Sequence, residues 1–88
     1  MNKDRRKEID TIRDRIELLR DEMDSIKSDI ENVRDEEQDY YDNMPESFQQ
    51  ADKGYAAEAA VGALEEALSG IEDFDIDSIT SSLETAAE

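Results

Sequence analysis

The residues best suited to chemistry lie near the end of an expected long helix, and their types suit ligand recognition. Tyrosine stacks on flat rings, arginine and lysine meet phosphate, and asparagine reads the edge of a base. The candidate ligand-binding residues are Arg34, Glu37, Tyr40, Tyr41, Asn43 and Lys53. Together they predict a site for a ligand of nucleotide size, with Arg34 and Lys53 on phosphate and either tyrosine on the base.

Glu37 is the most informative of these residues, because it occupies a position where the helix pattern expects an apolar side chain. A buried carboxylate is costly unless a cation, a hydroxyl or a ligand pairs with it. Two plainer interpretations stay open. Glu37 could lie where the helices splay open to solvent, and the tyrosines could cap a core.

A second candidate site is a spacing of carboxylates near the end of the chain. The first, third, fifth and twelfth positions of a calcium-loop pattern are filled by Asp73, Asp75, Asp77 and Glu84. These offsets wrap oxygen ligands around calcium, the one cofactor that the sequence suggests. However, Ser78 stands where the loop requires glycine, so the alternative is that Asp75 or Asp77 caps the last helix.

The residue types argue against an enzyme. The chain contains no cysteine and no histidine, which removes thiolate nucleophiles, imidazole bases and the usual zinc ligands. Neighbouring carboxylates such as Glu65 and Glu66 do not face each other on a helix. We therefore expect no catalytic residues and a protein that is not an enzyme.

Charge is distributed unevenly along the 88 residues. Residues 1–34 carry nine of the ten Lys and Arg residues against ten acids, whereas residues 35–88 carry sixteen acids against Lys53 alone. Such a field repels nucleic acid and anionic membranes and attracts basic partners. It predicts an acidic mimic of nucleic acid that binds a basic protein, or simply a solvated surface.

The elements that must position these residues are helices, and the first of them has a heptad pattern. Its a positions are Ile9, Ile16, Met23 and Ile30, its d positions are Ile12, Leu19, Ile26 and Val33, and Tyr40 and Met44 continue the alternating steps beyond Glu37. A seam this regular predicts a partner helix. Opposite charges at the g and e positions, such as Asp29 with Arg34, favour parallel over antiparallel pairing of two copies.

The second half is expected to fold back after a turn. Pro45 fits the first turn of a short helix, and the residues ahead of it can cap it. An Ala-rich helix follows, whose packing face is predicted to consist of Ala56, Ala59, Ala60, Ala63, Leu64, Ala67 and Leu68. A break after Gly70 separates it from a short C-terminal helix.

The fold class is therefore all-α: a heptad helix, a hairpin turn, an Ala-rich helix and a short last helix, forming an oligomeric helical bundle or coiled coil. The expected ranges are 1–41 for the heptad helix, 42–54 for the turn, 55–70 and 77–87 for the later helices, within a single domain 1–88. No stretch is apolar enough for a membrane span or signal peptide, which predicts a cytoplasmic protein. The oligomer number stays open.

One segment resembles a family of small acidic helical proteins encoded by bacteriophages. The segment reads R-D-E-E from Arg34, then D-N-M-P-E-S-F-Q from Asp42, then Lys53-Gly54. The resemblance covers about a quarter of the chain and implies a phage accessory protein in the host cell cytosol. It implies no activity that can be assigned to single residues.

Three functions suit such a protein. The first is counter-defence by an oligomer that sequesters a nucleotide immune signal at the hairpin. The second is the acidic mimic, and the third is a coiled-coil scaffold that uses the heptads alone. We rank them in this order, with a homo-oligomer expected and no direct binding to nucleic acid or membrane.

Overall fold

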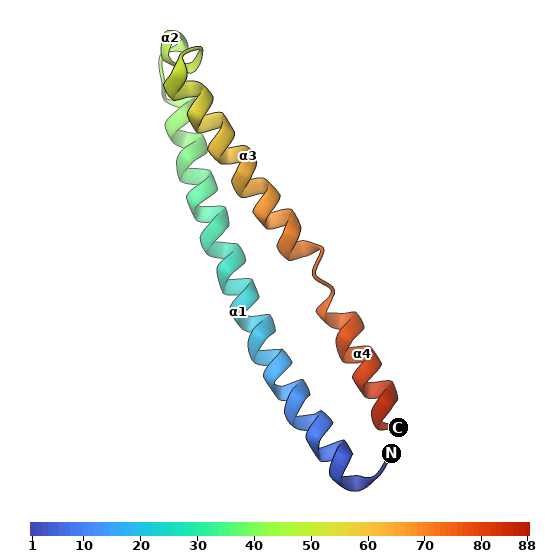
Figure 1. Ribbon diagram of the computed structural model, residues 1–88. Helices are drawn as coiled ribbons and strands as arrows, with labels where there is room; N and C mark the ends of the chain where they lie inside the picture. The colour runs from blue at the N-terminus through green and yellow to red at the C-terminus, as the bar shows by residue number, and fades with distance from the viewer. The chain divides into compact units, whose positions relative to one another are not determined.

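The computed structural model describes residues 1–88 and confirms the all-α fold class, because it contains four helices and no strand. These helices are α1 (Lys3–Asp42), α2 (Glu46–Gln49), α3 (Asp52–Glu72) and α4 (Ile76–Ala87) (Figure 1). Residue contacts divide the chain into two units. Unit 1 comprises Met1–Ser25 and Phe74–Glu88, and unit 2 comprises Ile26–Asp73. Helix α1 contributes to both units, and each is described by itself.

Local signals explain where α1 begins and ends. The backbone N–H of Arg5 donates to Oδ1 of Asn2 at 2.8 Å, which caps the first turn. No glycine or proline interrupts the 40 residues of α1. After Asp42 the chain turns, and Pro45 lies at the N-cap of α2, one residue before the predicted place in its first turn, with φ of −58° and ψ of 148°. No side chain caps α2, contrary to the prediction.

Only one edge of the heptad seam is covered within the chain, in unit 1 and in unit 2 alike. The a positions are buried or half-buried, and so are the e positions Arg13, Arg20, Lys27 and Arg34. The d row, which we define as Ile12, Leu19, Ile26, Val33 and Tyr40, is 41–52% exposed. In each unit, the a and e edge of α1 is thus the covered edge.

In unit 2, α3 packs through a face that differs from the predicted one. Its buried residues are Gly54, Ala57, Val61 and Leu68, with Ala60, Gly62, Leu64 and Ile71 half-buried. The prediction was right for Ala60, Leu64 and Leu68 and wrong for Ala56, Ala59, Ala63 and Ala67, which are exposed. Alanine buries little area, so the larger Val61 and Leu68 decide which face turns inward.

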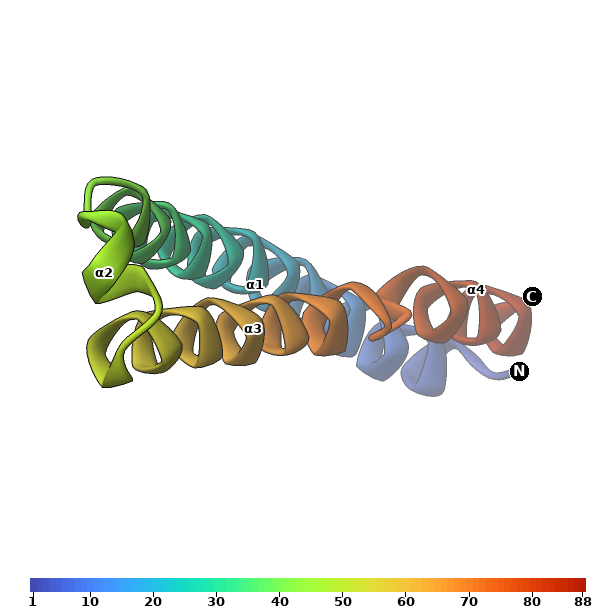
Figure 2. The ribbon, with the colours of Figure 1, turned by 90° about the horizontal axis from the view of Figure 1, so that it is seen from above.

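In unit 2, the start of α3 packs closely against α2. A Cβ atom at Gly54 would fall against the backbone of Gln49, so glycine is needed at this position. The side-chain amide of Gln49 donates to the carbonyl oxygen of Tyr41 at 3.0 Å, which ties α2 to the end of α1. Figure 2 shows α2 beside the first turn of α3. Helix α3 therefore starts at Asp52, three residues earlier than predicted.

In unit 1, α4 is held on α1 by buried aliphatic residues and by arginine side chains. Ile9 and Ile76 are buried, at 8% and 7% exposure. Arg13 Nη2 donates to Oε1 of Glu84 at 2.7 Å, and Arg20 Nη2 donates to Oδ1 of Asp77 at 2.6 Å. The hydrogen bond to Asp77 raises the pKa of Arg20 above its usual value.

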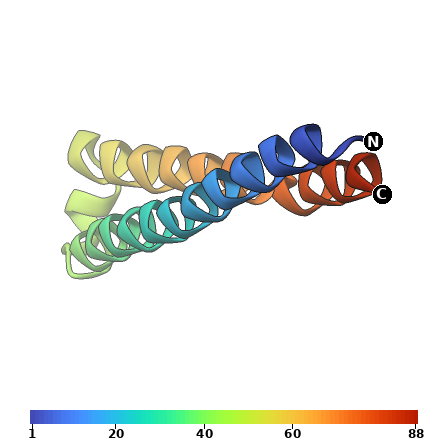
Figure 3. The ribbon, with the colours of Figure 1, turned by 90° about the horizontal axis from the view of Figure 1, so that it is seen from below.

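The two ends of the chain lie beside each other in unit 1, as Figure 3 shows. Arg6 makes the contact: its Nε donates to the carbonyl oxygen of Ala87 at 2.9 Å, and its Nη2 reaches the carbonyl oxygen of Glu88 at 3.5 Å. These carbonyls belong to the last turn of α4, whose oxygens have no partner within the helix. The arginine therefore also caps α4.

Candidate functional site at the hairpin

The hairpin of unit 2 carries a small hollow with aromatic walls. It has a volume of about 120 Å³ and is lined by Tyr40 and Met44 from the end of α1 and the following turn, Phe48 from α2 and Lys53 from α3. Tyr40 and Phe48 are 52% and 55% exposed. Two exposed rings beside an ammonium group can hold a flat ligand that carries negative charge.

Two of the predicted site residues, Tyr40 and Lys53, therefore line one hollow. Met44 and Phe48 complete it and were not predicted as site residues. A signal for both was present in the sequence. Met44 continues the heptad steps, and Phe48 is the one large apolar residue of α2.

Tyr41 faces a different hollow, because consecutive residues on a helix point about 100° apart. This second hollow, of about 280 Å³, is lined by Gln38, Tyr41, Glu58, Val61, Gly62 and Glu65. The nearby Glu58 carboxylate raises the pKa of Tyr41 above its usual value. Tyr41 is thus occupied by Glu58, a partner that the sequence did not point to.

The other three predicted residues line neither hollow. Arg34 donates from Nε and Nη2 to Oδ1 of its neighbour Asp35, at 3.2 and 3.1 Å. Glu37 is half-buried and forms no ion pair, and Asn43 is exposed. The six residues therefore do not form one preformed pocket.

The four carboxylates of the calcium pattern are not brought together either. Asp75 caps α4 by accepting from the backbone N–H of Ser78 at 2.9 Å, as the alternative interpretation predicts. Asp77 and Glu84 pair with arginines of α1, and Asp73 is exposed at the end of α3. No group of three or more acidic side chains is placed to hold a metal ion. Because α4 begins at Ile76, most of the expected loop is helix, and calcium binding stays a prediction.

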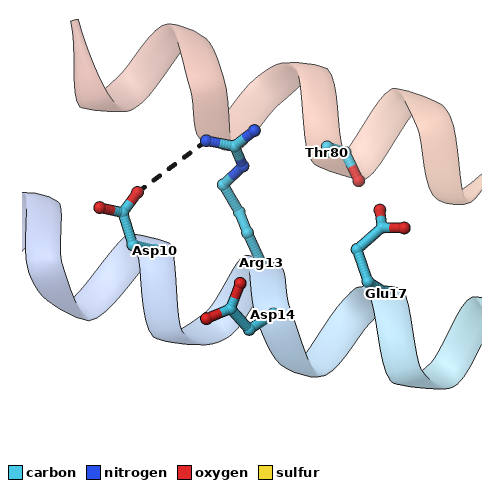
Figure 4. A pocket seen from close by; sticks show the side chains of 5 residues that line it. All are labelled: Asp10, Arg13, Asp14, Glu17 and Thr80. Atoms are coloured by element: carbon cyan, nitrogen blue, oxygen red, sulfur yellow. Dashed lines mark ion pairs between the residues drawn. The ribbon is translucent and has the colours of Figure 1, made fainter.

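Unit 1 has a polar hollow of its own, shown in Figure 4. It measures about 230 Å³ and is lined by Asp10, Arg13, Asp14, Glu17 and Thr80. Arg13 lies 3.9 Å from Asp10, and its Nε atom, like the Thr80 hydroxyl, is shielded from solvent without a hydrogen-bond partner. The guanidinium of Arg13 also pairs with Glu84. The ion pair that holds α4 on α1 therefore shapes this hollow.

Comparison with protein-family models, with curated proteins and with solved structures finds no match to this chain. The resemblance to the phage proteins stays a prediction. None of the four helices combines the length and apolar character that crossing a membrane requires.

Proposed function

We propose that this protein is a non-enzymatic binding protein that holds a flat, anionic ligand of the nucleotide type at its hairpin. The phage resemblance suggests that it acts in counter-defence by sequestering such a signal in the host cytoplasm. The observation that supports the proposal is the hollow between Tyr40, Phe48 and Lys53. Stacking of a base on an aromatic side chain contributes roughly 1–3 kcal/mol, which is enough to select a flat ring over other shapes.

Size and charge define what the hollow accepts. At about 120 Å³ it is smaller than most small-molecule sites, which measure about 300–1,000 Å³, so one chain holds at most a single ring. Lys53 is the one cation among residues 35–88, which makes a ligand with few negative charges the better fit.

The test is a panel of cyclic and ADP-ribose-type nucleotides, read by thermal shift and native mass spectrometry. A ligand that binds should raise the Tm of the native chain. Tyr40→Ala and Lys53→Ala should each abolish most of that shift. Tyr55→Ala is the matched control, because Tyr55 is 58% exposed but does not line the hollow. Failure of every nucleotide to shift the Tm would contradict the proposal.

The acidic mimic is the second candidate, and the distribution of ion pairs favours it. Among the acids of residues 35–88, only Asp35, Glu72, Asp77 and Glu84 lie in ion pairs. The other carboxylates are uncompensated and would attract a basic protein. Capture of a basic host protein that dissociates in high salt and is indifferent to Tyr40→Ala would support the mimic. A complex that survives high salt would count against it.

A further inference from the structure

The d row of α1 is an apolar surface that the chain itself does not cover. In unit 2 it consists of Ile26, Val33 and Tyr40, one heptad apart, and all three are at least 41% exposed. In unit 1 the same positions, Ile12 and Leu19, are exposed and border a shallow hollow of about 380 Å³. Apolar side chains repeating every seven residues match the spacing that a second helix requires.

Among the cations at the e positions of α1, one has no acidic partner on another helix. Arg13, Arg20 and Lys27, at successive e positions, pair with Glu84, Asp77 and Glu72. Arg34, at the next e position, contacts only its neighbour Asp35. Asp29, at the g position on the other side of Val33, is exposed and forms no ion pair.

We propose that a second copy of this chain docks on the d row, with the two α1 helices parallel and in register. Val33 then packs against Val33 of the second copy. Asp29 meets Arg34 of the second copy, because a g residue faces the e residue five positions later in a parallel pair. Antiparallel pairing would set the e positions of the two copies against each other and bring like charges together.

The parallel register also brings together the two hairpin hollows. Tyr40 is both the last residue of the d row and a wall of its hollow. In the pair, Tyr40 of the second copy adds a wall to a hollow that is too small for a nucleotide in one chain. The identity of the ligand in the enlarged site rests on the proposed function. The contact between the two copies does not, because it is inferred from the exposed d row alone.

The first experiment measures mass without any ligand, by native mass spectrometry and sedimentation over a concentration series. We expect a species of twice the 10.0 kDa of one chain, or a multiple of it. Val33→Asp should leave single chains. The matched control is Leu18→Asp, which places the same charge on a residue that is 70% exposed but lies outside the d row, and it should leave the assembly intact.

Charge reversal tests the pairing of Asp29 with Arg34. Arg34→Glu should raise the Kd of the assembly about tenfold, since two equivalent contacts become repulsive. The double variant Asp29→Arg with Arg34→Glu should restore the original affinity. Helix content by circular dichroism checks that each variant is folded.

The orientation can be read by crosslinking, because the chain has no cysteine. Tyr40→Cys alone should form a disulfide-linked pair on oxidation. A mixture of Ile26→Cys and Tyr40→Cys chains should give no 26–40 crosslink, and such a product would overturn the parallel register. A single-chain mass at every concentration would overturn the inference even if a nucleotide binds. An assembly that binds no nucleotide would keep the inference and overturn the proposed function.

Discussion

The two units use the same edge of α1 but fasten their helices by different chemistry. In unit 1, α4 is held by Arg13 and Arg20 on the carboxylates of Glu84 and Asp77, and the aliphatic residues Ile9 and Ile76 are buried. In unit 2, α3 is held by small and aliphatic residues, and Gly54 lets α2 approach. Ion pairs therefore predominate in unit 1 and close packing in unit 2, where Lys27 with Glu72 is the one ion pair between helices.

The largest expected effects come from truncating one buried aliphatic residue in each unit. Leu68→Ala and Ile76→Ala should each lower the free energy of unfolding by about 2 kcal/mol or more, because truncation leaves a cavity. Hydrogen exchange should separate them: Ile76→Ala should weaken amide protection in unit 1, and Leu68→Ala in unit 2. Equal loss throughout the chain after either change would show that the units do not open independently.

Gly54→Ala should be the next largest change, and it affects unit 2. A methyl group there meets the backbone of Gln49, and overpacking of this kind costs about 1–3 kcal/mol. Gly62→Ala is the control, because nothing lies within 4 Å of the added methyl group. It should stabilise the helix by about 0.5–1 kcal/mol. Urea unfolding followed by circular dichroism measures both, and equal effects would refute the close approach of α2.

A smaller effect is expected for the ion pairs that hold α4 on α1 in unit 1. Glu84→Gln removes the partner of Arg13, and an exposed ion pair contributes about 0.2–1 kcal/mol. The loss should appear as a lower Tm in dilute buffer and vanish in roughly 1 M salt, where charges are screened within about 3 Å. Glu66→Gln, at an exposed acid without an ion pair, should change nothing at either salt concentration.

The smallest effect is a pH dependence in unit 2. The interaction of Tyr41 with Glu58 raises the folded-state pKa of the tyrosine, so its stabilisation is complete below about pH 10. It is lost as the pH rises through the raised pKa, because tyrosinate repels the carboxylate. Ultraviolet absorbance should show a late-titrating tyrosine, which Tyr41→Phe removes. A late titration that survives Tyr41→Phe would refute the assignment.

The sequence predicted the helices well because their signals are local. The heptad, Pro45 and the cap at Asp75 each act within a few residues. The sequence could not predict which row of α1 stays exposed, since the a and d positions are equally apolar. Only the pairing of the e-position cations with distant acids decides this.

The candidate site was predicted less completely than the fold. Tyr40 and Tyr41 are neighbours in the sequence but belong to different hollows. The calcium spacing was visible in the sequence, whereas the sequence could not show that most of this segment belongs to α4, which begins at Ile76. Composition indicated the types of residue at the hairpin, and only the arrangement of α2 and α3 decides which of them meet.

The contact of Arg6 with the last turn of α4 has a practical consequence for engineering. Because the two ends of the chain are neighbours, a short linker can join Glu88 to Met1 without moving either helix. The circular chain loses conformational entropy when unfolded, so cyclisation should raise its Tm. Alternatively, new ends can be opened at the turn near Asn43, which gives a circular permutant.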